Sequence, residues 1–299
     1  MLEWIHGARL QESRNTAVYN RKGDIVYPVA AVGCVLRKEK DSRGAQRFHL
    51  EHTDDIMSVA VHPDGELVAT GQLGKRPKIL VWDSGTLQTV RELTGHSRGV
   101  SHLAFSGDSG AVLASVGMDD DHSIVLHDWN NSTILGRTRG HPRQPYALCF
   151  TPDNRGLVLA GQKYILFIAM SGRNFAKKPA VFEGKGVMQD FLSIGWAARD
   201  AIIGCETGEL YRFKDEKLVH IYDAHTGPVN SISSNVHGLV SGSKDGTIKL
   251  WSSTMELQRE FNITKLASSL KPQVRSLFWL QKAQKVWREF LVTVKSRGA

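Results

Sequence analysis

The 299-residue sequence contains no run of about 18 apolar residues, so it offers no candidate for a membrane-spanning helix. Its first residues, MLEWIHGARLQ, lack the basic start and apolar core of a signal peptide. Only three cysteines occur, far apart at Cys34, Cys149 and Cys205, which is the pattern of buried thiols in a reducing compartment. No Cys-x-x-Cys or paired Cys/His spacing is present, so we expect no zinc site. These absences predict a cytoplasmic protein without a membrane segment.

A nucleotide-binding loop is also missing. The segment ATGQLGKRPKILVWD, residues 69–83, contains Gly74-Lys75 ahead of an apolar run. A Walker-type loop needs glycine five residues earlier, a hydroxyl residue directly after the lysine, and then a helix. Ala69 and Arg76 stand at those two positions, and the run KILVWD is β-branched and aromatic. The segment therefore predicts a turn between two strands.

Positive charge is concentrated at the two ends of the chain. Residues 1–50 carry nine Lys/Arg and five Asp/Glu, and residues 256–299 carry nine and three, whereas the remaining 205 residues carry 20 and 22. The net charge of +8 thus arises at the ends, which would attract an acidic partner. Nucleic acid is not expected as a partner, because no nucleic-acid-binding motif accompanies the charge.

The sequence repeats with a period of 42 to 45 residues. Four segments align: HTDDIMSVAVHPDGELVATGQ, GHSRGVSHLAFSGDSGAVLASVG, GHPRQPYALCFTPDNRGLVLAGQ and AHTGPVNSISSNVHGLVSGSKDGTIKLW. Their marker histidines, His52, His96, His141 and His225, are separated by 44, 45 and 84 residues, the last being two periods of 42. A repeat of this length with a Gly-His opening and a Trp-Asp close is typical of the four-stranded blade of a β-propeller.

Local chemistry accounts for the parts of one blade. In the first repeat SVAV alternates as a strand does, HPDG is a turn, and LVAT and ILVW are the next two strands. A single blade cannot bury its sheet alone, so we predict an all-β WD-repeat propeller of about six blades with an incomplete seventh. The blades are expected at residues 13–50, 51–94, 95–139, 140–183, 184–223 and 224–261, and the seventh over 262–299 with strands at 274–279 and 290–294. Because the last sheet stops after its second strand, we expect the sequence to be part of a longer protein.

The last complete repeat contains a polar set with two interpretations. His225, Ser241, Asp245 and Trp251 match the hydrogen-bonded set typical of WD-repeat blades, yet a histidine, a serine and an aspartate are also the residues of a catalytic triad. We predict a structural network, because partial copies recur in other blades and a catalytic site would not be repeated in this way. The counterparts are His52 with Trp82 and Asp83, and His96 with Asp128, while His127, Ile168 and Phe213 take the tryptophan position in three blades.

No other group of residues predicts catalysis. The run Asp119-Asp120-Asp121-His122 has the chemistry to hold a cation, but its place in a blade favours a solvated turn. His49 and His52 are three residues apart in an extended segment, which predicts opposite faces. We therefore expect no enzyme activity, no catalytic residues, no cofactor and no metal.

The opening residues are not generic blade sequence. LEWIHGARLQESRN, followed by GDIVYPVAAVGCVL, resembles the hydrophobic motif that opens the paired-propeller domain of the echinoderm microtubule-associated protein-like family. The stretch of residues 69–83, with DDI and HPD ahead of it, is similar to a second signature of that family. We therefore assign residues 1–12 to the motif and 13–299 to the propeller, although His6 and Ala8 stand where the family has tyrosines. The residues that match the motif include Leu2, Glu3, Trp4, Gly7, Arg14 and Asn15.

The resemblance implies a cytoskeletal role. Proteins of this family associate with microtubules, and their paired propellers are implicated in binding tubulin, so tubulin or microtubules are the expected partner. A monomer in the cytoplasm is expected, since the coiled coil that makes many members trimeric is absent, as is a second propeller. The alternative is a general interaction scaffold in a signalling or ubiquitin-ligase complex. Candidate contact residues are cations on blade loops where acidic residues also occur: Lys75, Arg76, Lys78, Arg98 and Arg143.

Overall fold

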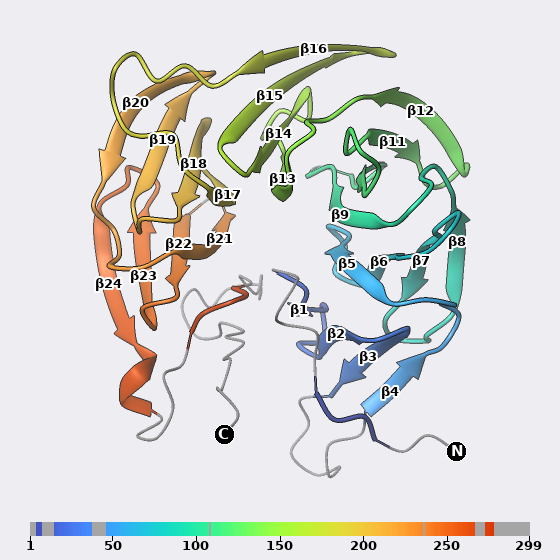
Figure 1. Cartoon of the computed structure of the whole chain (residues 1–299). Coiled ribbons are helices and arrows are strands. Elements are labelled where there is room, and N and C mark those ends of the chain that lie inside the picture. The colour runs from blue at the N-terminus through green and yellow to red at the C-terminus, as the bar shows by residue number, and fades with distance from the viewer. Residues whose placement is uncertain are drawn as a thin grey trace. The chain divides into compact units, whose positions relative to one another are not determined.

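The computed structural model describes residues 4–7, 15–37, 46–107, 109–235, 237–266 and 273–277. In these parts of the chain the regular structure consists of β-strands and one short 3-10 helix, Ile263–Leu266 (Figure 1). The strands form six four-stranded sheets, and in every sheet they follow one another in sequence order. This arrangement confirms the predicted all-β fold of propeller blades.

The chain divides into two compact units, and the first is built mainly from Met1–Pro142. It contains the first three sheets. Their strands are β1 (Val18–Tyr19), β2 (Ile25–Val29), β3 (Val32–Leu36) and β4 (Gln46–His49); β5 (Ile56–Val61), β6 (Leu67–Gln72), β7 (Ile79–Asp83) and β8 (Thr89–Leu93); β9 (Val100–Phe105), β10 (Val112–Gly117), β11 (Ile124–Asp128) and β12 (Thr133–Thr138).

The second unit is built mainly from Arg143–Ser171 and Phe175–Trp279 and contains the other three sheets. Their strands are β13 (Pro145–Phe150), β14 (Gly156–Gly161), β15 (Tyr164–Ser171) and β16 (Asn174–Pro179); β17 (Phe191–Ala197), β18 (Asp200–Cys205), β19 (Leu210–Lys214) and β20 (Lys217–Tyr222); β21 (Val229–Asn235), β22 (Gly238–Ser243), β23 (Thr247–Ser252) and β24 (Leu257–Asn262).

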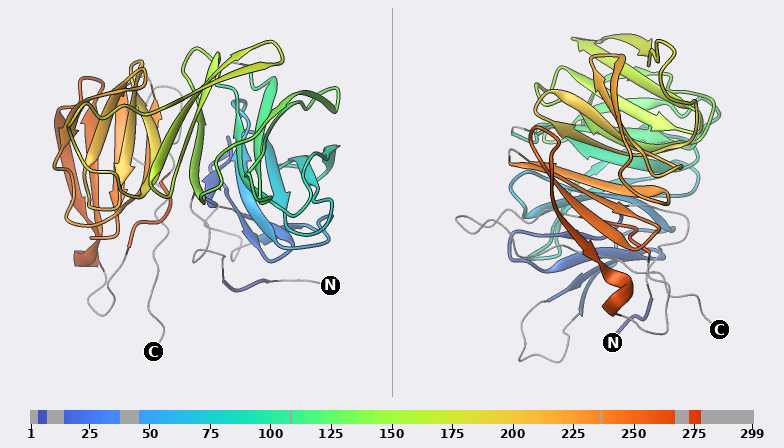
Figure 2. Two further views of the ribbon diagram at one scale, coloured as in Figure 1. Left: turned by 45° about the horizontal axis from the view of Figure 1, so that its top comes forward. Right: turned by 90° about the vertical axis from the view of Figure 1, so that its left-hand side faces the viewer.

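Neighbouring sheets within a unit contact each other through their first strands. In the first unit β5 lies beside β9, and in the second β17 lies beside both β13 and β21 (Figures 1 and 2). In the second to sixth sheets the second strand is buried at almost every position, as in β14 and β22, whereas β24 is exposed along its whole length. Within each unit the core therefore lies between sheets, because the apolar face of one sheet is covered by its neighbour.

A serine and a glycine fasten one sheet to the next. Ser58 on β5 donates its hydroxyl to the backbone oxygen of Val100, the first residue of β9, at 2.9 Å. Opposite Ser58 stands Gly71, where an added Cβ would lie only 2.7 Å from the Val100 side chain. Ser58 thus supplies a hydrogen bond between the two sheets, and Gly71, which has no Cβ, leaves room for the side chain of Val100. The second unit repeats the arrangement with Ser193, Gly204 and Val229.

Residues 273–277 continue this pattern beyond the sixth sheet. Val274 packs against Gly242, which has no space for a Cβ, and its backbone oxygen accepts a hydrogen bond from the side-chain amide of Asn230 at 2.9 Å. Val274 therefore stands where the first residue of a further blade would be. The predicted strand over 274–279 is described only as far as Leu277, and here it comprises one bridge residue, Val274.

The fourth strands β8, β12, β20 and β24 carry a bulge. Register shifts on the third strand, beside Trp82 and its counterparts, leave one residue of the fourth strand unpaired. Bulges bend a strand and protect a sheet edge from pairing with other chains. The bulges also explain why several apolar side chains of the fourth strands are exposed, because these side chains belong to the unpaired residues. The unpaired residues are Val90, Leu135, Val219 and Gln258.

Candidate functional site

The polar set of the sixth sheet forms one connected network. Nε2 of His225 lies 2.8 Å from Oγ of Ser241, and Nε1 of Trp251 donates to the same oxygen at 2.9 Å. On its other side, Nδ1 of His225 lies 2.7 Å from Oγ1 of Thr247. Because Ser241 is fully buried between two rings, its hydroxyl is shielded from any substrate in solution. The geometry ties the loop before β21 to β22 and β23.

Asp245 completes this network by accepting hydrogen bonds from the loop before β21 and from the first residue of β23. Its Oδ1 accepts hydrogen bonds from the backbone N–H and the hydroxyl of Thr247, both at 2.7 Å, and its Oδ2 accepts from the N–H of Thr226 at 2.9 Å. Burial alone would raise the pKa of Asp245, but the His225 ring, whose Nδ1 lies 3.6 Å from Oδ2, and the hydrogen bonds from Thr247 and Thr226 outweigh it and lower that pKa. The carboxylate is thus ionised and fully engaged in holding the turn.

The second sheet has the same network with threonine as its centre. Nε2 of His52 lies 2.6 Å from Oγ1 of Thr70, and Nε1 of Trp82 donates to that oxygen at 3.0 Å. Nδ1 of His52 lies 2.8 Å from Oε1 of Gln72. Thr70 was not recognised from the sequence, although it stands at the fourth position of its second strand, as Ser241 does.

His49 and His52 are closer than their spacing predicted. Their rings lie 6.1 Å apart, edge to face, and His49 stacks on Trp82 with 4.6 Å between ring centres. The expectation of opposite faces is wrong: β4 ends at His49, so the alternation of a strand does not extend to His52. Burial lowers the pKa of His49 to about 4. The described residues nonetheless contain no group of three His, Cys, Asp or Glu side chains that could hold a metal ion.

In the third sheet two histidines share one serine. Oγ of Ser115 lies 2.8 Å from Nε2 of His96 and 2.9 Å from Nε2 of His127, which takes the place of the tryptophan. Burial lowers the pKa of His96 to about 4 and the pKa of His127 to about 4 as well. Both rings are therefore neutral at physiological pH. Asp128 caps the following turn through hydrogen bonds to Asn131.

The fifth sheet replaces the network with aromatic rings. Phe182, Phe191, Tyr211 and Phe213 contact one another with ring centres about 6 Å apart. The Tyr211 hydroxyl accepts a hydrogen bond from the N–H of Val187 at 2.9 Å and so fixes the loop that a histidine fixes elsewhere. Because aromatic rings replace the polar set in this sheet, a structural role for the polar set in the other sheets is consistent with the fold.

The acidic residues 119–121, which follow β10, form hydrogen bonds or ion pairs with other residues of the chain. Asp119 accepts hydrogen bonds from the backbone and hydroxyl of Ser123. Its two acidic neighbours form ion pairs, and their carboxylates are not clustered around a common centre. These pairs are Asp120 with Arg98, at 2.5 Å, and Asp121 with Arg139, at 3.4 Å.

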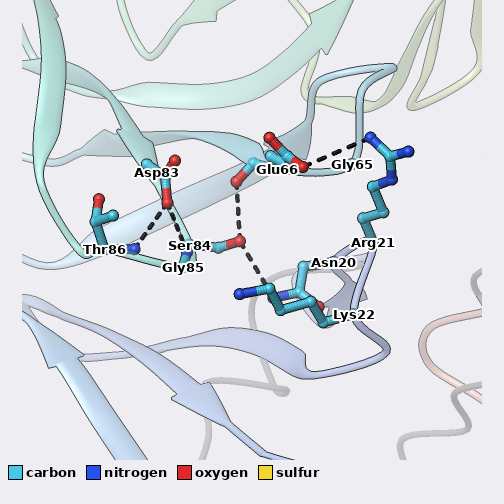
Figure 3. Close-up of a pocket in the computed structure, with 9 residues that line it drawn as sticks. All are labelled: Asn20, Arg21, Lys22, Gly65, Glu66, Asp83, Ser84, Gly85 and Thr86. Atoms are coloured by element: carbon cyan, nitrogen blue, oxygen red, sulfur yellow. Dashed lines mark hydrogen bonds and ion pairs between the residues drawn. The ribbon is translucent and has the colours of Figure 1, made fainter.

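An open cavity of about 220 Å³ lies between turns of the first two sheets (Figure 3). The Ser84 hydroxyl donates to the backbone oxygen of Glu66 at 2.8 Å and accepts from the Asn20 amide at 3.2 Å. Arg21 pairs with Glu66 at 3.5 Å. Asp83 accepts two backbone N–H groups of its own turn, at 2.7 Å each. These polar groups are hydrogen-bonded or ion-paired within the chain, and the bonds of Ser84 with Asn20 and of Arg21 with Glu66 join the two sheets beside the cavity.

The candidate contact cations fall into two groups. Three of them are engaged within the chain: Lys78 with Glu92 at 2.9 Å, Arg98 with Asp120 at 2.5 Å, and Arg143 with the backbone oxygen of Lys163 at 3.3 Å. The other two, Lys75 and Arg76, are exposed at the turn between β6 and β7. Neither makes a hydrogen bond or ion pair with any residue that the structure describes.

Part of the N-terminal motif runs beside β4. The side-chain amide of Gln46 binds the backbone of Ile5 twice, accepting its N–H at 2.8 Å and donating to its oxygen at 3.0 Å. Trp4 is 41% exposed and donates from Nε1 to His6 at 3.2 Å. Gly7 and Asn15 have positive φ, of 97° and 55°. Leu2, Glu3, Arg14 and the predicted strand at 290–294 lie outside the described residues.

In the described part of the chain no helix has the length and apolar character needed to cross a bilayer.

Comparison with known proteins gives a consistent result. Residues 45–294 match the family model described as the echinoderm microtubule-associated protein first beta-propeller, and residues 1–34 match the HELP motif. The chain is 29% identical over 294 residues to echinoderm microtubule-associated protein-like 4 of Xenopus laevis, covering 88% of this chain and 31% of that one. It is 30% identical over 266 residues to the 77 kDa echinoderm microtubule-associated protein of Lytechinus variegatus, covering 84% and 40%.

A third relative is echinoderm microtubule-associated protein-like 2 of Rattus norvegicus, 30% identical over 280 residues, with 88% of this chain and 43% of that one covered. The chain thus spans less than half the length of these relatives. Among solved structures, the Cps50 (Swd1) β-propeller domain of Myceliophteria thermophila matches with a TM-score of 0.62 and 14% identity, over 74% of this chain and 76% of that one. At this identity the match shows the fold alone.

Proposed function

The chain belongs to the echinoderm microtubule-associated protein family, and we propose that it acts as a non-catalytic binding module whose partner is tubulin or the microtubule. The observation that supports this most strongly is the joint match of a HELP motif and a first propeller of one family along the sequence. Relatives of the chain are named microtubule-associated proteins. We place its action in the cytoplasm, at the cytoskeleton.

Burial of the triad-like residues supports a non-catalytic role. The three networks contain histidines and hydroxyls at hydrogen-bonding distance, but Ser241 and Ser115 are fully buried and Thr70 is 1% exposed. A nucleophile must reach a substrate, and these hydroxyls face rings and backbone instead. Their arrangement holds loops to strands, so the chemistry of the site is that of a scaffold.

The charges on the loops suggest how a partner is bound. Two of the candidate cations, Lys78 and Arg98, are neutralised by carboxylates of the same chain, so the attraction between these loops and an acidic protein rests on the remaining cations. Association that depends on such groups weakens as salt screens them. We therefore expect tubulin binding to be measurable at low salt and weaker at physiological salt.

Gel filtration of the protein with unpolymerised tubulin tests the proposal, after circular dichroism has shown that the protein is folded. We expect co-elution at low salt that declines at physiological salt, and no co-elution with serum albumin, an acidic control protein. A folded protein that elutes apart from tubulin at both salt concentrations would contradict the proposal and favour a general scaffold role.

A further inference from the structure

We propose that Lys75 and Arg76 form a preorganised contact site for an acidic, carboxylate-rich peptide segment of the partner. The two residues lie at the tip of the hairpin between β6 and β7. The identity of the protein that carries the segment rests on the proposed function. The recognition of acidic peptide rests on the geometry and charge of the hairpin itself.

Neighbouring loops hold the hairpin in place. The N–H of Leu73 donates to the backbone oxygen of Asp55 at 2.8 Å, and the N–H of Gly74 donates to that of Arg98 at 3.0 Å. These acceptors belong to the loops before β5 and before β9, one on each sheet. A Cβ added at Gly74 would lie 2.7 Å from Oδ2 of Asp54, so the chain is closely packed there as well. The tip is therefore presented on a fixed backbone.

Arg76 has a strained conformation. Its φ is 54°, in the left-handed region where a side chain costs free energy that glycine does not. It also precedes Pro77, and a following proline further restricts the backbone of the residue before it. Of the non-glycine residues with positive φ in the described segments, Arg76 alone precedes a proline. Strain of this kind at an exposed charged residue points to a role in binding.

The charge around the tip selects the ligand. Nearby cations are already paired with carboxylates, whereas Lys75 and Arg76 have no such partner among the described residues. Because the two cations belong to adjacent residues, each can bind one of two successive carboxylates along an acidic peptide. The guanidinium can also bind a carboxylate through two hydrogen bonds. Asp54, beside Gly74, reduces the positive potential without cancelling it.

Fluorescence anisotropy of a labelled octaglutamate peptide with the whole chain tests the site at low and physiological salt. The variant K75E/R76E should weaken peptide binding about tenfold or more, because attraction becomes repulsion. A matched control, R199E/K214E, makes the same change in net charge at two exposed cations of the fifth sheet. It should change the dissociation constant by less than about twofold, because neither residue belongs to the hairpin or to the loops that contact it.

Two further variants separate binding from folding. R76G relieves the strain, so it should leave thermal stability unchanged or raised while weakening peptide binding about threefold to fivefold. D54N removes a competing carboxylate and should tighten binding by about twofold.

The inference is overturned if octaglutamate does not bind the wild-type chain, or if K75E/R76E and its control weaken it equally. In that case co-elution with tubulin would still support the proposed function. Peptide binding that is lost in K75E/R76E, without any binding of tubulin, would uphold the site and refute the proposed partner.

Discussion

The serine shared by two histidines in the third sheet makes stability depend on pH. His96 and His127 lie on either side of Ser115, and both are more than 90% buried. Burial lowers the pKa of each from 6.5 to about 4. The folded chain therefore keeps both rings neutral over a pH range in which the unfolded chain binds protons.

The sign and size of the effect follow from proton linkage. Between pH 6.5 and 4 the unfolded state holds more protons, so the free energy of unfolding falls as the pH falls, and the stabilisation is complete only above pH 6.5. A histidine with these two pKa values loses about 2 kcal/mol of stability between about pH 7 and 5. The full pKa shift of each histidine corresponds to about 3 kcal/mol in the free energy of unfolding.

The variant H127Q isolates one of these contributions. A glutamine amide can hydrogen-bond to Ser115 as the ring does, but it does not titrate. We expect H127Q to be less stable than wild type by about 1 kcal/mol near neutral pH, because packing is lost. At about pH 5 it should equal or exceed wild type, because it avoids a cost of about 2 kcal/mol.

Urea denaturation at about pH 7, 6 and 5, followed by circular dichroism, measures the difference between variant and wild type. The control W251F removes the hydrogen bond from Trp251 to Ser241 and no titratable group. Its destabilisation should be the same at each pH. If H127Q and wild type lose stability in parallel from pH 7 to 5, the assignment of a buried, neutral His127 is refuted.

Two further changes test the links between and within sheets. G204A should destabilise the second unit by about 1–3 kcal/mol, because the new Cβ would lie 2.9 Å from the Val229 side chain; thermal unfolding measures this, and an unchanged melting temperature would contradict the close approach. D245A should cost about 2 kcal/mol, because it leaves the N–H groups of Thr226 and Thr247 without their acceptor; urea denaturation measures this, and a loss below about 0.5 kcal/mol would show that the loop does not depend on the carboxylate.

The fold was predictable because each repeat carries its own strand and turn signals. The period of about 43 residues, the Gly-His openings and the alternating strands are local properties, and they identify propeller blades without knowledge of long-range contacts. The polar set around Ser241 was predictable for the same reason, since its members occupy repeated columns. Thr70 and Ser115 occupy the same column as Ser241, and a comparison of that column across the aligned repeats could have identified them.

Other features depend on contacts that no single repeat encodes. The pairing of Arg98 with Asp120 joins two different loops, so the sequence alone could not separate paired cations from the free pair at residues 75–76. The approach of His49 to His52 depends on a change of direction at the end of one strand. Ser58 appears in the sequence as an ordinary strand residue, and only its hydrogen bond to Val100 shows that it joins two sheets.

The sequential strand order has a consequence for synthesis of the chain. Every sheet is completed within 32 to 39 consecutive residues, and each of its pairings joins strands that are adjacent in sequence. Contacts of such short separation carry a small loop-closure cost, and segments formed from them can fold as they leave the ribosome. At the junctions that begin with Val100 and Val229, this valine then joins the next repeat to the finished blade through a serine and a glycine. The chain is thus suited to fold from its N-terminus one blade at a time, with little unpaired strand exposed during translation.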